Sequence, residues 1–107
     1  MQSRLNGLIG LSCRAGQIIL GGDLALRAVR ADQAMMVLLD ANASEGTKKK
    51  LRDACAFRQL PCFELEAGVL GRSCGQPDRI AAAVKPGSLG QQIQELLSKE
   101  EESSSKD

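Results

Sequence analysis

Two glycines, an aspartate and an arginine at helical spacing form the first group of residues with chemical potential. In "LGGDLALRAVR", Gly21 and Gly22 precede Asp23, and Arg27 follows one helical turn later. In one interpretation, the glycines permit a tight turn, and Asp23 caps the following helix and complements its dipole. In the other, a helix start without side chains lets an RNA backbone or base edge approach the amides, and Arg27 supplies the counter-charge. The residues alone favour the helix cap.

A run of basic residues forms the second group, and it consists of Lys48, Lys49, Lys50 and Arg52. The run lies in the early turns of a predicted helix, where cations oppose the helix dipole. A solvated helix face is the favoured interpretation, because charge runs usually have that role. If the chain binds RNA, the same side chains would contact phosphates.

The residues that catalysis needs are missing or scattered. The chain has no histidine, the commonest group that exchanges protons near neutral pH, and no two of its aspartates form a recognisable pair. Neither glycine-rich stretch ends in the Gly-Lys-Ser/Thr of a phosphate-binding loop. We therefore expect neither an enzyme nor a cofactor. With two Phe and no Tyr or Trp, an aromatic surface for stacking bases is not expected either.

The four cysteines, Cys13, Cys55, Cys62 and Cys74, contain no C-x-x-C pair, and no histidine is present to complete a mixed zinc site. Their spacing favours buried free thiols over disulfides or metal ligands. We expect the cysteines to be reduced and metal-free.

The elements that must position these groups follow from hydrophobic periodicity and from turn residues. A length of 107 residues suits one domain, which we place at residues 1–98. The chain alternates predicted helices and strands: a helix near 3–14, strand 17–20, a helix with the core stripe Leu24, Ala25, Ala28 and Val29, strand 34–39, a helix over 45–58 capped by Ser44, strand 61–65, a short helix within 67–75, strand 79–84 and a helix after Pro86. This alternation predicts an α/β protein, a three-layer α/β/α sandwich with a four-stranded mixed sheet.

The charge is divided along the chain. Residues 1–98 hold 12 basic and 9 acidic side chains, whereas residues 99–107 hold 2 basic and 4 acidic ones and no apolar residue. We expect this tail, residues 99–107, to be disordered. No signal-peptide pattern or membrane-length apolar run is present, so a cytoplasmic protein without a membrane partner is expected.

The stretches "AGQIILGGDLALRAVRADQAMMVLLDANAS", "TKKKLRDAC", "LPCFEL" and "LGRSCG" resemble, in order and spacing, the kink-turn-binding ribosomal protein superfamily. They are most similar to the large-subunit seven-Ae and thirty-e type and its bacterial YlxQ-like branch. The resemblance runs from about Leu5 to Val84. It implies the α/β/α sandwich and an RNA site that combines the start of the second helix with the loop after "LGRSCG".

The resemblance also assigns positions within that site. Gly21 and the basic Arg27 match the family pattern, whereas Asp23 and Leu24 stand where the family has the Asn and Glu that read tandem sheared G·A pairs. An aspartate is acceptor-only and a leucine offers no polar atom. Polar Gln76-Pro77-Asp78 stands where the family inserts an apolar wedge. The candidate RNA-binding residues are Gly21, Gly22, Asp23, Arg27, Lys48, Lys49, Lys50, Arg72, Gln76 and Arg79.

Two hypotheses about function remain open. In the first, the chain is a non-catalytic RNA-binding protein that works on or beside the ribosome and is expected to be a monomer. It recognises structured RNA, of which a kink-turn is one example. In the second, it is a protein-interaction module that kept the fold and lost kink-turn recognition. An RNA affinity that falls steeply with added salt would support the first hypothesis, and no affinity at low salt would support the second.

Overall fold

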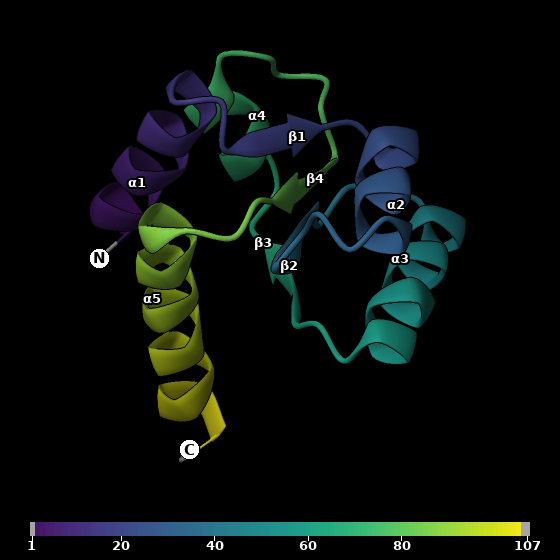
Figure 1. The fold of residues 1–107 in the computed structure, drawn as a ribbon. Coiled ribbons are helices and arrows are strands. Elements are labelled where there is room, and N and C mark those ends of the chain that lie inside the picture. Colours follow the sequence, from purple (N-terminus) through teal and green to yellow (C-terminus); the bar gives the residue numbers. More distant parts are fainter. Residues whose placement is uncertain (1, 106–107) are drawn as a thin grey trace.

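The computed structural model describes residues 2–105, which form five helices and four strands (Figure 1). In chain order, the elements are α1 (Gln2–Arg14), β1 (Ile18–Leu20), α2 (Gly22–Arg30), β2 (Met36–Asp40), α3 (Glu45–Arg58), β3 (Cys62–Leu65), α4 (Val69–Cys74), β4 (Ala81–Val84) and α5 (Ser88–Ser105). Each predicted element is present, and apart from the end of α5 the ends lie within a few residues of the expected positions.

The four strands form one mixed sheet in the order β1-β4-β2-β3. Strand β4 pairs antiparallel with both β1 and β2, with Ala83 opposite Ile19 on one side and Val37 on the other. Strand β2 pairs in parallel with β3, with Leu38 opposite Phe63. All residues of the two central strands, β2 and β4, are buried, as expected for strands that helices cover on both faces.

Two layers of helices enclose the sheet (Figure 1). Helices α1 and α5 lie on one side of it and α2 and α3 on the other. Alternate side chains of β2 divide between two clusters: Met36 and Leu38 pack with residues of α1, α4 and α5, whereas Val37 and Leu39 pack with residues of α2 and α3. The predicted three-layer α/β/α sandwich with a four-stranded mixed sheet is therefore confirmed.

Helix α3 has the boundaries that its sequence predicts. The Ser44 hydroxyl accepts a hydrogen bond of 3.1 Å from the Thr47 amide, which is the expected N-cap. At the other end, Gln59 adopts a left-handed conformation and stops the helix. Leu51 and Cys55 face the core, and Ala54 packs partly buried against it.

Helix α5 differs from expectation because it continues to Ser105, whereas residues 99–107 were predicted to be disordered. The reason is local: lysine and glutamate are strong helix formers, so the helix propagates beyond the turns that pack on the sheet. The prediction for residues 106–107 lies outside the described part of the chain.

The last side chain of α5 that the structure describes as buried is Leu97, which is 6% exposed. We therefore expect deletion of residues 99–107 to leave the melting temperature unchanged, because it removes no described buried contact. Deletion of residues 93–107 is the matched control: it also removes Ile93 and Leu97, and it should lower the melting temperature clearly. A lower melting temperature for the shorter deletion would show that the final residues pack against the domain.

Candidate RNA-binding edge

The mixed pairing of the strands brings several helix starts to one edge of the sheet. Leu20 at the end of β1 lies opposite Ala82 near the start of β4, and Asp40 at the end of β2 lies opposite Leu65 at the end of β3. The segments that follow or precede these residues must share that edge. We call these segments, together with the end of β2 and the first turns of α2 and α4, the loop edge: residues 21–27, 40–47, 66–72 and 75–80.

Helix α2 begins at the loop edge with glycine as its N-cap. Gly21 has φ 114° and ψ 141°, a conformation that side-chain-bearing residues rarely adopt, and its N–H donates a 2.8 Å hydrogen bond to the Ala81 carbonyl. The helix starts at Gly22 and has no side-chain cap. The interpretation of Asp23 as the N-cap is therefore wrong: Asp23 lies inside the first turn, where its charge complements the helix dipole.

Leu24 and Arg27 both face solvent on α2. Ala25, Ala28 and Val29 form the buried stripe as predicted, but Leu24 is 51% exposed, so its assignment to the core was wrong. Leu24 precedes Ala25 and therefore projects about 100° around the helix from it. Arg27 is exposed one turn beyond Asp23, and among the described residues no carboxylate lies within ion-pair distance of it.

The starts of α2 and α3 are neighbours. A Cβ atom placed on Gly22 would lie 3.8 Å from Cγ2 of Thr47, which is an ordinary van der Waals contact. The space beside Gly22 is thus large enough for a methyl group. At Gly21, in contrast, the positive φ disfavours any residue with a side chain.

Asp40 ties the end of β2 to the loop before α4. It is 3% exposed, and its Oδ1 and Oδ2 atoms accept hydrogen bonds of 2.7 Å from the Asn42 and Gly68 amides, respectively. Hydrogen bonds to a charged group contribute about 1.5–3 kcal/mol each, so this carboxylate is a structural anchor. The sequence pattern did not single out this role, because Gly68 lies 28 residues away from Asp40 in the chain.

The loop between α4 and β4 lies directly on α4. A Cβ atom on Gly71 would be 2.7 Å from the Gln76 carbonyl oxygen and 2.8 Å from Cα of Pro77, so only glycine allows this approach. Arg79 Nε donates a 3.0 Å hydrogen bond to the side-chain oxygen of Gln76. The predicted site residues Gln76 and Arg79 are exposed and adjacent, and Arg72 is exposed on α4 with its guanidinium over Gly68.

The run Lys48, Lys49 and Lys50 does not form one basic patch. Lys48 is only 7% exposed, and its Nζ lies 3.4 Å from Glu64 and 3.8 Å from Glu45; its role as a phosphate contact stays a prediction, which this burial does not favour. Lys49 forms a 2.8 Å ion pair with Asp53. Successive residues of a helix point about 100° apart, which separates the three ammonium groups. Arg52, the last member of the run, pairs with Glu64 at 2.6 Å, and Lys50 remains exposed.

The chain combines this α/β/α sandwich and loop edge with a sequence match to a known family. Residues 3–92 match the ribosomal protein L7Ae/L30e/S12e/Gadd45 family, and the chain belongs to it. Among curated proteins, it is 36% identical to the RNA-binding protein YlxQ of Bacillus subtilis over 84% of this chain and 91% of that protein. It is 35% identical to the RNA-binding protein YlxQ of Enterococcus faecium over 84% of this chain and 87% of that protein.

Solved structures are also similar to this chain. A protein with unknown function from Bacillus halodurans matches with a TM-score of 0.83 and 32% identity over 88% of this chain and 96% of that chain. The 15.5kD RNA binding protein of Giardia lamblia matches with a TM-score of 0.72 and 25% identity over 89% of this chain and 82% of that chain. The family resemblance inferred from the sequence motifs is therefore confirmed.

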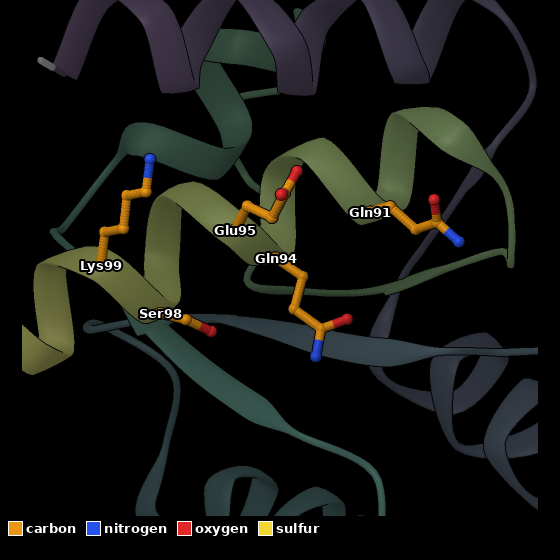
Figure 2. A pocket seen from close by; sticks show the side chains of 5 residues that line it. All are labelled: Gln91, Gln94, Glu95, Ser98 and Lys99. Carbon is orange, nitrogen blue, oxygen red and sulfur yellow. The ribbon is translucent and has the colours of Figure 1, made fainter.

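The larger pocket described along α5 does not resemble an active site. Its volume is about 530 Å³, and Gln91, Gln94, Glu95, Ser98 and Lys99 line it. Figure 2 shows that Glu95 and Lys99 extend to one side of the helix and Gln94 and Ser98 to another, so the polar groups do not converge. Nothing in the sequence singled out these residues.

Within residues 2–105, no helix combines the length and apolar character that crossing a bilayer requires. In the same residues, no three cysteine or carboxylate side chains gather as ligands for a metal ion.

The four thiols lie in two hydrogen-bonded pairs that their spacing in the sequence did not predict. Cys55 and Cys62 form one pair: their hydrogen bond raises the pKa of Cys55 and lowers that of Cys62, and Arg52 lowers the pKa of Cys62 further. In the other pair, burial raises the pKa of Cys74 to about 12, and its contact with Cys13 raises it too. All four are free thiols here, and the absence of bound metal in the purified protein stays a prediction.

We expect iodoacetamide to modify Cys62 faster than Cys74 near neutral pH, because the thiolate is the reactive form and its fraction is larger where the pKa is lower. Peptide mass spectrometry over a time course measures both rates. Cys55→Ala should slow the reaction of Cys62 by removing its hydrogen-bond donor, whereas Cys13→Ala should leave it unchanged. Faster labelling of Cys74 in the parent protein would contradict the prediction.

Proposed function

We propose that the chain is a non-catalytic RNA-binding protein that recognises structured RNA through the loop edge and works on or beside the ribosome. The observation that carries the proposal is the glycine-capped start of α2, with exposed Arg27 one turn later, in a chain whose curated relatives are named RNA-binding proteins. We further propose that it acts as a cytoplasmic monomer.

The start of α2 supplies suitable chemistry for a phosphate. The first amides of a helix point outward and carry the positive end of its dipole, so they attract anions. Gly21 adds no side chain that would compete for these amides or block their approach. Arg27, Arg72 and Arg79 are exposed, and each guanidinium can donate paired hydrogen bonds to a phosphate or to a guanine edge.

Asp40, the buried carboxylate of the loop edge, has a structural role. Asp40 is buried, and both of its oxygens accept hydrogen bonds from backbone amides, so its side chain is committed to holding the loops together. With no histidine in the chain, the edge offers a surface for recognition and no acid–base pair.

Protein interaction is the second candidate function, and the exposure of Leu24 favours it. Leu24 is 51% exposed at the loop edge, and an apolar side chain there suits a protein surface better than the polar edge of a base pair. The two functions differ in salt dependence, because counterion release makes RNA affinity fall steeply as salt is added. Absence of RNA affinity at low salt would favour the protein-interaction function.

Arg27→Ala should weaken binding to structured RNA by about 1–3 kcal/mol, because it removes a guanidinium without disturbing the buried stripe of α2. Fluorescence anisotropy with a panel of labelled ribosomal RNA fragments measures the change. Arg14→Ala is the matched control, since exposed Arg14 ends α1 near the start of β1, at the opposite edge of the sheet. Equal affinity of Arg27→Ala and the parent protein across the panel would remove the loop edge as the RNA site.

Restoring the polar pair of the family with Asp23→Asn and Leu24→Glu should raise affinity for a kink-turn that carries tandem G·A pairs. The double variant should fold like the parent protein, because both side chains are exposed. Anisotropy with the kink-turn, compared with the same RNA lacking the G·A pairs, measures the gain. A folded double variant that shows no preference for the kink-turn would separate this chain from kink-turn recognition.

A further inference from the structure

One aromatic side chain lies on the surface far from the loop edge. Phe57, in the last turn of α3, is 83% exposed, whereas Phe63, the other aromatic residue of the chain, is buried in the core. An aromatic ring in water adds little to folding, because burial of apolar surface is what stabilises the fold. From the count of aromatic residues alone, no surface for stacking a base was expected. That count could not show that one of the two rings is exposed.

Phe57 borders a hollow between α2 and α3. These helices run in parallel: Gly22 lies beside Thr47 at their starts, and at their ends Arg58 Nη2 donates a 2.9 Å hydrogen bond to the Arg30 carbonyl. The hollow has a volume of about 550 Å³, and we call it the Phe57 hollow; its lining residues are Arg30, Lys50, Asp53, Ala54, Phe57 and Arg58.

The charge of the Phe57 hollow suits an anion. Arg30 and Lys50 are exposed, and among the described residues no carboxylate lies within ion-pair distance of either. The single carboxylate of the lining, Asp53, is already paired with Lys49 at 2.8 Å. Two cations without a carboxylate partner in the described part of the chain therefore line the same hollow as the aromatic ring.

Arg58 fixes the position of this surface. Its guanidinium donates a 2.8 Å hydrogen bond to Asp32 in the turn after α2 and lies 5.7 Å from the centre of the Phe57 ring. This contact falls within the range of cation–π interactions. Arg58 thus holds the ring beside the end of α2 and leaves most of it in solvent.

We propose that the Phe57 hollow binds single-stranded RNA, with one unpaired base stacked on Phe57 and neighbouring phosphates held by Lys50 and Arg30. Bases of every type stack on an aromatic ring, and cations along the groove follow the backbone, so this combination binds single strands with little sequence preference. A protein partner would require an apolar centre, whereas apart from Phe57 and Ala54 all the lining side chains are charged.

The Phe57 hollow is a second site, distinct from the loop edge of the proposed function. Arg27 and Arg30 lie three residues apart on α2 and therefore on the same side of that helix. A strand that leaves a structured RNA at the loop edge can pass Arg27 and reach Arg30 and Phe57. The protein would then recognise a folded RNA together with an unpaired segment beside it.

Phe57→Ala should weaken binding of a fluorescein-labelled oligouridylate by roughly 5- to 150-fold at low salt, the range typical of losing one stacked base. Phe57→Tyr should bind like the parent protein, because it keeps an aromatic ring. Lys50→Gln should weaken binding, whereas Lys99→Gln, which removes the same charge from α5, should not. Unchanged melting temperatures, expected for exposed side chains, show that the variants are folded.

Photocrosslinking locates the contact independently. An oligouridylate that contains 4-thiouridine should crosslink to Phe57 or its immediate neighbours, as identified by mass spectrometry of the peptide. Crosslinks confined to residues 21–27 and 75–80, or equal oligouridylate affinity for Phe57→Ala and the parent protein, would overturn the proposal. It would also be overturned if Phe57→Ala lost a copurifying protein but kept its oligouridylate affinity, since the hollow would then be a protein-docking surface. The loop-edge proposal is tested separately by the affinity of Arg27→Ala for structured RNA. A failure of one proposal can therefore be distinguished from a failure of the other.

Discussion

The antiparallel pairing of β4 with both β1 and β2 is the constraint on which the rest of the structure depends. It places β4, last of the strands in the chain, between the first two, so the ends of β1 and β2 lie beside the start of β4. The backbone N–H of Gly21 can then donate a hydrogen bond to the Ala81 carbonyl, and the backbone N–H of Asp40 can donate one to the Ile80 carbonyl, both at 2.8 Å. The start of α2 and the loop after α4 meet because of this pairing, although more than 50 residues separate them in the sequence.

The small side chains of β4 make this arrangement compatible with close packing. Ala81 and Ala83 face α2 and α3, whereas Ala82 faces the other helical layer, and all three are fully buried. Larger side chains here would push the helices outward, since cores are already packed to near crystal density. Helix α2 can therefore lie low against the sheet, with Ala25, Ala28 and Val29 buried and its first turn at the loop edge.

The sequence predicted the fold well because its strongest signals are local. The run before Asp40 is apolar at every position, and Ser44 followed by an amphipathic segment defines α3, so strand and helix could both be placed. The site was predicted less completely, because accessibility depends on contacts across the fold. The burial of Lys48 requires Glu64 from β3, the pairing of Cys55 with Cys62 requires α3 to pack beside β3, and the anchor at Gly68 requires Asp40. The spacing of residues along the chain does not predict any of these contacts, because they join different elements of the fold.

The fold and the ligand constrain different parts of the loop edge. The backbone features of the loop edge, such as the positive φ of Gly21 and the close approach at Gly71, are fixed by the fold and do not depend on the ligand. Asp23, Leu24 and Arg27 are all exposed, so the packing of the core places little constraint on their identities. An aspartate repels a phosphate at close range, a leucine adds apolar surface, and an arginine attracts the backbone. If this surface is the RNA site, as proposed, it has limited means to read a polar base pair, and recognition must depend more on RNA shape and on contacts outside the loop edge.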